Sequence, residues 1–89
     1  MITPKIREEG GRFVVDAAGP VWWCTTREEA EAVVEGLNIF HGPRPTRQRV
    51  QAALDRLARV GIHQHNLSED GVFARQVASR LESAEQPWA

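Results

Sequence analysis

The sequence predicts an α+β fold, in which a three-stranded antiparallel sheet is followed by three helices in the order βββααα. Apolar and polar residues alternate over residues 2–24, and glycines interrupt that alternation at turn positions. Residues 27–81 instead hold three stretches with apolar residues at the i, i+3, i+4 spacing of a helix. A chain of 89 residues suits one compact domain. We therefore expect a single domain over residues 1–82.

The first two strands are predicted over residues 2–8 and 12–16. Gly10 and Gly11 lie between them, and a two-residue type I′ turn requires positive φ at both central positions. This turn sets the register, which places Lys5 opposite Asp16, Arg7 opposite Val14, Ile6 opposite Val15, and Glu8 opposite Phe13. The core face of the hairpin should then consist of Ile6, Phe13 and Val15.

The third strand follows a turn whose length decides which of two tryptophans is buried. Asp16 and Gly19 suit the first and fourth positions of a type I turn followed by a left-handed residue, which gives a three-residue loop. That loop pairs Val15 with Val21, so Trp23 points inward and Trp22 outward. A two-residue loop would shift the register by one residue and exchange the two tryptophans. We favour the three-residue loop.

Each of the three predicted helices has a residue suited to cap its N-terminus. Thr26 and Glu29 form a capping box for the first helix, residues 27–40, whose buried stripe should be Ala30, Val33, Val34, Leu37 and Phe40. Thr46 caps the second, which ends near Val60 and Gly61, with the stripe Val50, Ala53, Leu54, Leu57 and Val60.

Ser68 should cap the third helix, which ends near Leu81, and its stripe is Phe73, Val77 and Leu81. Leu67 is placed to pack against Val72 as a hydrophobic staple. The prolines of residues 41–45 separate the first two helices. Residues 83–89 are expected to form a flexible tail, in which Trp88 is a candidate anchor.

Composition limits the location of the protein and the classes of partner it can bind. No apolar run reaches the ~20 residues that span a bilayer, and no secretory leader is recognised, so we expect a cytoplasmic protein without a membrane partner. Charge is uneven along the chain: residues 1–40 hold four basic and seven acidic side chains, whereas residues 41–65 hold five arginines and one aspartate. This pattern fits either an acidic first helix packed near a basic second helix, or a surface for a polyanion.

The first candidate site is the outward face of the predicted sheet, formed by Arg7, Val14 and Trp22. An aromatic ring beside an aliphatic side chain and a guanidinium is a combination enriched in protein interfaces. We therefore expect this surface to bind a protein partner, or a second copy of the chain in a homo-oligomer. The alternative is that helices cover this face, or that Arg7 stacks on Trp22 within the monomer.

The second candidate site is basic and comprises Arg44, Arg47, Arg49, Arg56 and Arg59. On a helix Arg49 and Arg56 lie on nearly the same side, so the group could follow the phosphates of a nucleic acid. A solvated helix face is the alternative. A helix-turn-helix is disfavoured, because the segment from Gly61 to Leu67 is too long and Glu69 and Asp70 would meet the DNA.

Residues that could carry chemistry are few. His63 and His65, with His41 and Cys24 as further candidates, lack the spacing of a zinc site, and Cys24 is the single cysteine. No set of acid, base and nucleophile is recognisable, so we expect no enzyme activity, cofactor or metal.

The sequence is therefore interpreted as a small regulator or inhibitor that occupies the surface of another protein. Its size and character match those of inhibitors encoded by phages or mobile elements, such as anti-CRISPR proteins. The alternative is a nucleic-acid-binding regulator that uses the arginine-rich helix.

Overall fold

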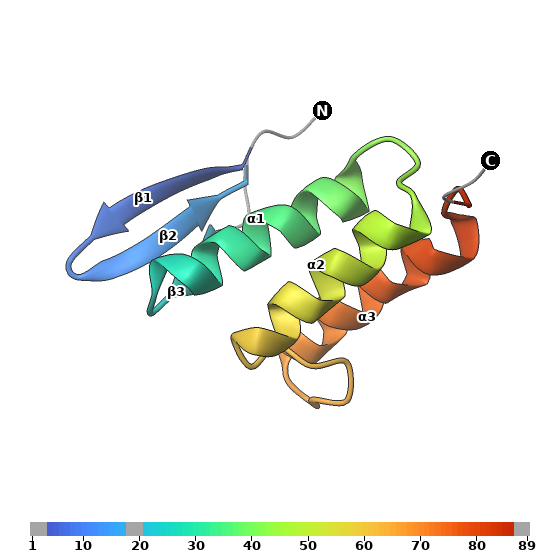
Figure 1. Ribbon diagram of the computed structural model, residues 1–89. Helices are drawn as coiled ribbons and strands as arrows, with labels where there is room; N and C mark the ends of the chain where they lie inside the picture. The colour runs from blue at the N-terminus through green and yellow to red at the C-terminus, as the bar shows by residue number, and fades with distance from the viewer. Residues whose placement is uncertain (1–3, 18–20, 87–89) are drawn as a thin grey trace.

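The structure, a computed structural model, describes residues 4–17 and 21–86 and confirms the predicted βββααα order in a compact domain (Figure 1). The strands are β1 (Lys5–Glu9), β2 (Arg12–Asp16) and β3 (Val21–Cys24), in the sheet order β1-β2-β3. The helices are α1 (Arg27–His41), α2 (Arg47–Arg59) and α3 (Glu69–Ser83). Each helix starts at the residue that the sequence predicted and ends within about two residues of the predicted end.

The hairpin of β1 and β2 has the predicted register. Lys5 lies opposite Asp16, Ile6 opposite Val15 and Arg7 opposite Val14. Gly10 and Gly11 both have positive φ, 59° and 78°, as a type I′ turn requires. The turn thus sends Ile6, Phe13 and Val15 to the side of the sheet that joins the core.

The predicted register of β3 is wrong by one residue. Val15 lies opposite Trp22 and Val14 opposite Trp23, whereas the prediction placed Val15 opposite Val21. The last pair of this ladder is Asp16 with Val21, so four residues, 17–20, separate the paired ends. Trp22 therefore points into the core and Trp23 points out, the reverse of the prediction. The predicted type I turn includes residues 18 and 19, which lie outside the described residues.

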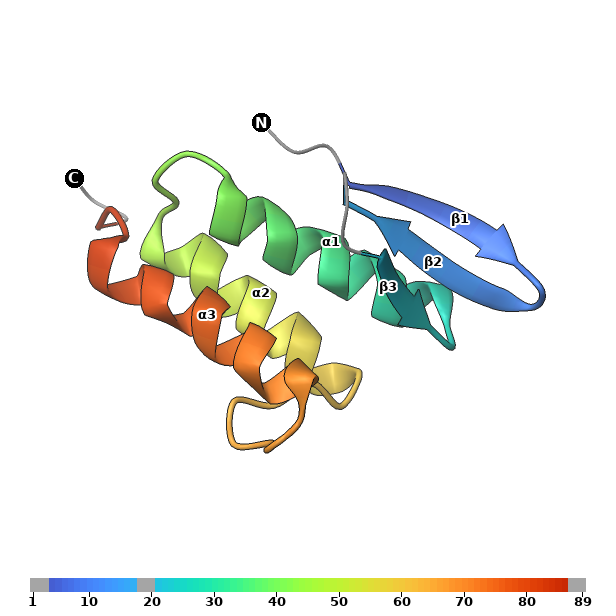
Figure 2. The same ribbon diagram turned by 180° about the vertical axis from the view of Figure 1, so that it is seen from behind.

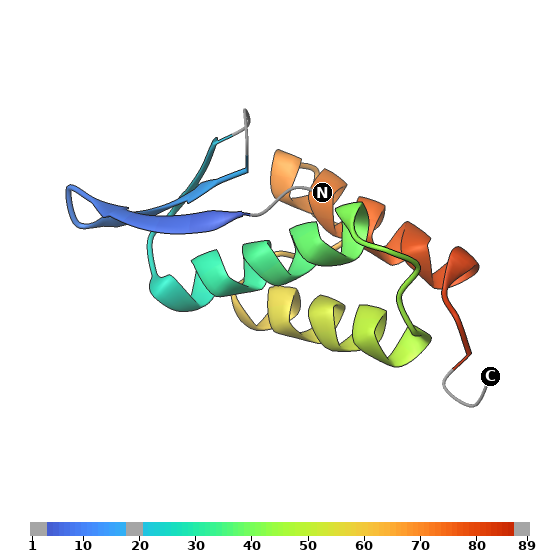
Figure 3. The same ribbon diagram turned by 90° about the horizontal axis from the view of Figure 1, so that it is seen from above.

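Helix α1 lies at the centre of the domain. It contacts all three strands, and α2 and α3 pack against it and against each other (Figure 2). Seen from above, the sheet lies against the first half of α1, and α3 begins close to the end of the sheet (Figure 3). Among the described residues α1 is the only helix in backbone contact with the strands, so the outer face of the sheet has no helix over it.

The central position of α1 explains why its buried surface is wider than the predicted stripe. Ala30, Val33 and Leu37 are buried as expected, whereas Val34 and Phe40 are half-buried. Ala32, Gly36 and Ile39 are buried as well, because a helix packed on two sides needs more than one apolar stripe. The predicted stripe of α2 is buried except for the half-buried Val60, and in α3 Phe73 and Val77 are buried and Leu81 is half-buried.

The N-terminal caps of α1 and α2 form as predicted. Thr26 accepts a hydrogen bond from the Glu29 backbone N–H at 3.1 Å, and Thr46 accepts one from Arg49 at 3.2 Å. The Glu29 carboxylate accepts from the backbone N–H and the hydroxyl of Thr25, at 3.2 and 3.1 Å, rather than from the cap residue itself. The reciprocal bond of the capping box is thus displaced by one residue.

Gly61 completes the C-terminus of α2, as its position predicted. Its φ of 86° lets its own N–H donate to Ala58 at 3.1 Å and the Ile62 N–H donate to Leu57 at 2.9 Å. These two bonds form a Schellman motif, which directs the chain so that Ile62 is buried.

The start of α3 differs from the prediction. Ser68 is the N-cap residue, but its side chain makes no capping hydrogen bond. Leu67 is 99% exposed and Val72 45% exposed, so the predicted staple is wrong. Gly71 instead lies against the chain before the helix, where a Cβ would collide with the Asn66 carbonyl oxygen. Close backbone packing thus takes the place of the staple.

The chain after α3 returns to the start of α2. The Glu85 backbone accepts a hydrogen bond from Arg47 at 2.9 Å and donates one to Pro45 at 2.8 Å, and Ala84 is buried. These bonds hold the beginning of the segment that was expected to be a tail. Trp88 lies outside the described residues.

Candidate partner-binding surface

The structure does not assemble the predicted surface of Arg7, Val14 and Trp22. Arg7 and Val14 lie on the outer face of the sheet, but the one-residue shift of β3 puts Trp22 on the inner face. Trp23 takes its place, directly across from Val14 and with 54% of its surface exposed. The outer face thus keeps an aromatic, an aliphatic and a guanidinium, with a different tryptophan.

Trp22 is held on the inner face by α3. Its ring centroid lies 4.6 Å from that of Phe73, with the two ring planes inclined by 56°. Phe73 itself is buried, and Trp22 is half-buried against the core. The alternative, stacking of Arg7 on Trp22, is excluded because the two side chains lie on opposite faces. Arg27 instead lies over a different ring, 5.6 Å from the Phe13 centroid.

Val14 is completely buried, although it lies on the outer face. It does not belong to the core cluster, and among the described residues no helix covers it. Its direct cross-strand neighbours on this face are Arg7 and Trp23. Trp23 therefore lies directly across from a buried apolar side chain.

A groove runs beside β3, between this strand and the first turn of α3. Its lining comprises Val21, Trp22, Trp23, Glu69 and Asp70, and its volume is about 400 Å³. Val21 is 46% exposed, so the strand presents apolar side chains toward an acidic helix start. From the sequence, Glu69 and Asp70 argued only against contact with DNA. The groove depends on the register of β3, so the sequence did not predict it.

Negative charge is concentrated at this groove. Burial raises the pKa of Asp70 above its usual value, and the neighbouring carboxylates of Glu29 and Glu69 raise it further. Within residues 4–17 and 21–86 the ion pairs involve other acids, so neither Glu69 nor Asp70 has a cationic partner there. Their proximity to the positive end of the α3 dipole stabilises both carboxylates in part.

The five predicted arginines do not form one free surface. Arg56 bridges α2 to α1 through Glu31 at 3.1 Å and Glu35 at 3.3 Å, which confirms the packing of an acidic helix beside a basic one. Arg44 donates to the Ser83 carbonyl, and Arg47 donates to the Leu81 carbonyl at 3.2 Å, at the negative end of α3. Of the five, only Arg49 and Arg59 make no side-chain hydrogen bond or ion pair with another described residue.

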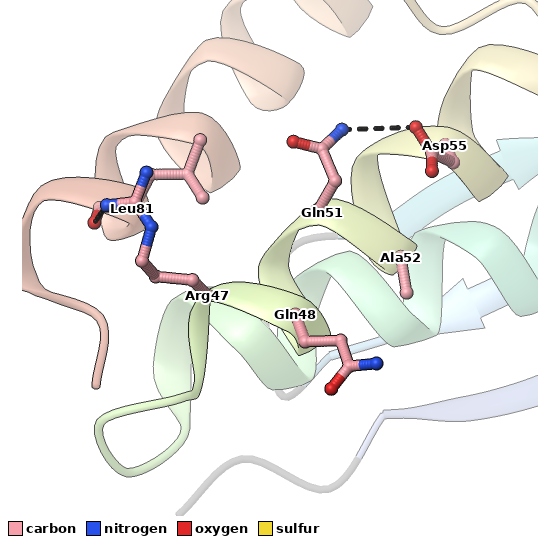
Figure 4. Close-up of a pocket in the computed structure, with 6 residues that line it drawn as sticks. All are labelled: Arg47, Gln48, Gln51, Ala52, Asp55 and Leu81. Atoms are coloured by element: carbon pink, nitrogen blue, oxygen red, sulfur yellow. Dashed lines mark hydrogen bonds between the residues drawn. The ribbon is translucent and has the colours of Figure 1, made fainter. Parts of the chain in front are cut away.

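An open groove between α2 and α3 is lined by Arg47, Gln48, Gln51, Ala52, Asp55 and Leu81 (Figure 4). Its polar groups are partly engaged within the protein, since Gln51 donates to Asp55 at 3.1 Å and Arg47 is held by α3. Its lining holds the guanidinium of Arg47, the amides of Gln48 and Gln51, the carboxylate of Asp55 and two apolar side chains, and no set of acid, base and nucleophile in mutual contact.

His63 and His65 lie side by side, and Cys24 is buried. His63 and His65 stack with ring centroids 5.1 Å apart, and the described residues contain no cluster of three or more side chains able to hold a metal. Cys24 is 1% exposed, and burial, followed by the charges of Glu29 and Asp70, raises its pKa to about 11. A thiol with so high a pKa is a poor nucleophile near neutral pH.

Two further findings bear on what the chain is. None of the helices that the structure describes is both long enough and apolar enough to cross a bilayer. Comparisons of the chain with models of known families, with curated proteins and with solved structures found no match.

Proposed function

We propose that the protein is a small, non-enzymatic regulator or inhibitor that acts in the cytoplasm by occupying the surface of a partner protein. The observation that carries this proposal is the 54% exposure of Trp23 on a sheet face that no described helix covers. Tryptophan is among the residues most enriched at the energetic centres of protein interfaces, and its exposure in a monomer is unfavourable. Inhibitors carried by phages and mobile elements need no more than such a surface.

The size of the face supports a binding surface that extends beyond the sheet. Three strands spaced about 4.8 Å apart and about five residues long cover a patch of roughly 15 Å by 15 Å. A stable interface usually covers about 800 Å² on each partner. A partner centred on Trp23 would therefore also reach Val21 and the groove beside α3, which lie next to it.

Capture of a partner with matched variants tests the proposal. The tagged protein is incubated with lysate of the cells that carry the gene, and any stoichiometric partner is purified and titrated by calorimetry. We expect Trp23→Ala to weaken binding by more than about 2 kcal/mol, as for a central interface residue. Leu67→Ala is the control, because Leu67 is equally apolar and 99% exposed but lies outside the sheet. Equal binding by both variants would contradict the proposal.

Nucleic-acid binding is the competing outcome of the same experiment. Of the five candidate arginines, Arg49 and Arg59 have side chains without a partner among the described residues, whereas Arg56 is neutralised by two carboxylates. If the captured material is nucleic acid, affinity should fall steeply between low and moderate salt, and Arg49→Gln should weaken it while Trp23→Ala should not. That result would replace the protein-binding proposal.

A further inference from the structure

Within residues 4–17 and 21–86, the outer edge of β3 has backbone groups with no strand beside them. In an antiparallel ladder the N–H and C=O of one residue point to the same neighbouring strand, and successive residues alternate between neighbours. The type I′ turn makes Glu9 and Arg12 the hydrogen-bonded pair that closes the first hairpin. Val14 and Asp16 therefore also bond toward β1, and Phe13 and Val15 bond toward β3.

This alternation continues into β3. Trp22 and Cys24, opposite Val15 and Phe13, bond to β2, so the N–H and C=O of Val21 and Trp23 point away from the sheet. Among the described residues no strand lies on that side, and α3 makes no backbone contact with β3. Two donors and two acceptors thus face the groove, which is the arrangement that an added strand requires.

We propose that this edge of β3 accepts an extended segment of a partner protein as a fourth strand, with a lysine or arginine side chain in the groove beside Trp23, Glu69 and Asp70. This inference rests on the proposed function and names the chemistry of its partner. The charge of the groove specifies the cation, because Glu69 and Asp70 have no cationic partner among the described residues. The indole face of Trp23 adds a favourable site for the same cation.

The same charges argue against the other occupants. A second copy paired through its own β3 would bring two sets of Glu69 and Asp70 toward one another, and its Val21–Cys24 strand carries no basic residue to offset them. A nucleic acid would place phosphates against these carboxylates. A basic, extended peptide is the occupant that the groove complements.

Peptide selection tests this proposal directly. A phage-displayed library of random peptides, about twelve residues long and thus able to span the four residues of β3, is selected on the intact protein. We expect enriched sequences to share one lysine or arginine flanked by β-branched or aromatic residues at alternate positions. Enrichment without a basic position, or no enrichment at all, would overturn the proposal.

Backbone pairing is then tested on the best peptide. Replacing single amide N–H groups by N-methyl along the peptide should weaken binding about tenfold or more at alternate positions and little between them. Equal tolerance at all positions would mean that the peptide does not pair with β3, and would also overturn the proposal.

Variants of the protein separate this inference from the proposed function. Val21→Pro removes an outward N–H at the first residue of the strand, where proline is tolerated, and Glu69→Gln with Asp70→Asn removes the charge. Each change should weaken binding of the peptide about tenfold or more and leave the circular dichroism spectrum of the protein unchanged. If Trp23→Ala weakens binding of a purified partner but these variants do not, the proposed function stands and the strand-addition inference fails.

Discussion

The ring centroids of Trp22 and Phe73 lie 4.6 Å apart, with the ring planes inclined by 56°, and this contact links the sheet to α3. Aromatic pairs in this geometry contribute about 0.5–1.5 kcal/mol beyond the area they bury. Because neighbouring strand residues point to opposite faces, the contact that buries Trp22 also exposes Trp23. The packing of a helix late in the chain thus determines which tryptophan is available to a partner.

The two tryptophans should differ sharply in their effect on stability. We expect Trp22→Ala to lower the free energy of unfolding by about 3 kcal/mol, because it removes a ring packed on Phe73 and the core. Trp23→Ala should lower it by about 1 kcal/mol or less, because Trp23 is mostly exposed and lies outside the core cluster. Urea denaturation of both variants measures these free energies. Equal losses of stability would contradict the assignment of Trp22 to the core face and Trp23 to the outer face.

The sequence predicted the first hairpin better than the third strand for a physical reason. Gly10 and Gly11 admit one turn type, and that turn fixes the register by itself. The stretch from Asp16 to Val21 is compatible with two loop lengths, and both leave a tryptophan on each face. The choice depends on Phe73, about fifty residues away, which no local pattern of residues 16–23 reveals.

Gly36 permits the close approach of α1 and α3. A Cβ at this position would lie 2.7 Å from the tip of the Phe73 ring and 3.4 Å from a methyl of Val77. Phe73 cannot move freely, because it is buried and packed on Trp22. Gly36→Ala should therefore destabilise the protein by about 1 kcal/mol or more, although alanine favours helix by up to about 1 kcal/mol in an unconstrained position.

A second substitution shows whether Phe73 is the obstacle. Phe73→Leu shortens the side chain that the new Cβ would meet. In a double-mutant cycle followed by thermal unfolding, Gly36→Ala should cost less in the Phe73→Leu background than in the native chain. Additive effects would show that the cost at Gly36 arises elsewhere.

The caps of α1 and α3 offer a matched comparison. Thr26 accepts a backbone hydrogen bond from Glu29, whereas the Ser68 side chain makes no such bond. Thr26→Ala should therefore lower the free energy of unfolding by about 1 kcal/mol, and Ser68→Ala by a few tenths at most. Chemical denaturation of the two variants checks this, and a larger loss at Ser68 would show that its hydroxyl caps α3 in solution.

Much less of the candidate surface than of the fold was predictable from sequence. Arg7 and Val14 were placed on the outer face correctly, because they belong to the hairpin that the glycines define. Glu69 and Asp70 join β3 only through the packing of α3, so their sequence position gave no sign of the groove. Arg56 was expected on a solvated face, but α1 supplies two carboxylates that the helical spacing of α2 cannot reveal.

Cys24 should resist chemical modification, and it should make the free energy of unfolding fall at alkaline pH. Its pKa is raised from 9.0 to about 11, so the thiol stays protonated in the fold where the unfolded chain would ionise. The stability from this group is present below pH 9 and is lost as the pH rises toward 11. Denaturation at several pH values should show this decline, and Cys24→Ala should show a smaller one. The chain has no tyrosine to obscure the comparison.

Alkylation gives an independent measure of the same thiol. Iodoacetamide at pH 8 should modify native Cys24 far more slowly than the protein in urea, because the side chain is both 1% exposed and protonated. Similar rates in the two conditions would mean that the end of β3 opens readily in the native protein.

Arg56 should contribute to stability, whereas Arg49 should not. Arg56 donates to Glu31 and Glu35 across the α1–α2 interface, but about a third of its side chain is exposed, so water screens both pairs. We expect Arg56→Gln to cost about 1 kcal/mol and Arg49→Gln, which breaks no bond with another described residue, to be close to neutral. Raising the salt concentration should narrow this difference, because the partly exposed pairs are weakened by screening. Equal stability of the two variants at low salt would mean that the helices hold together by apolar packing alone.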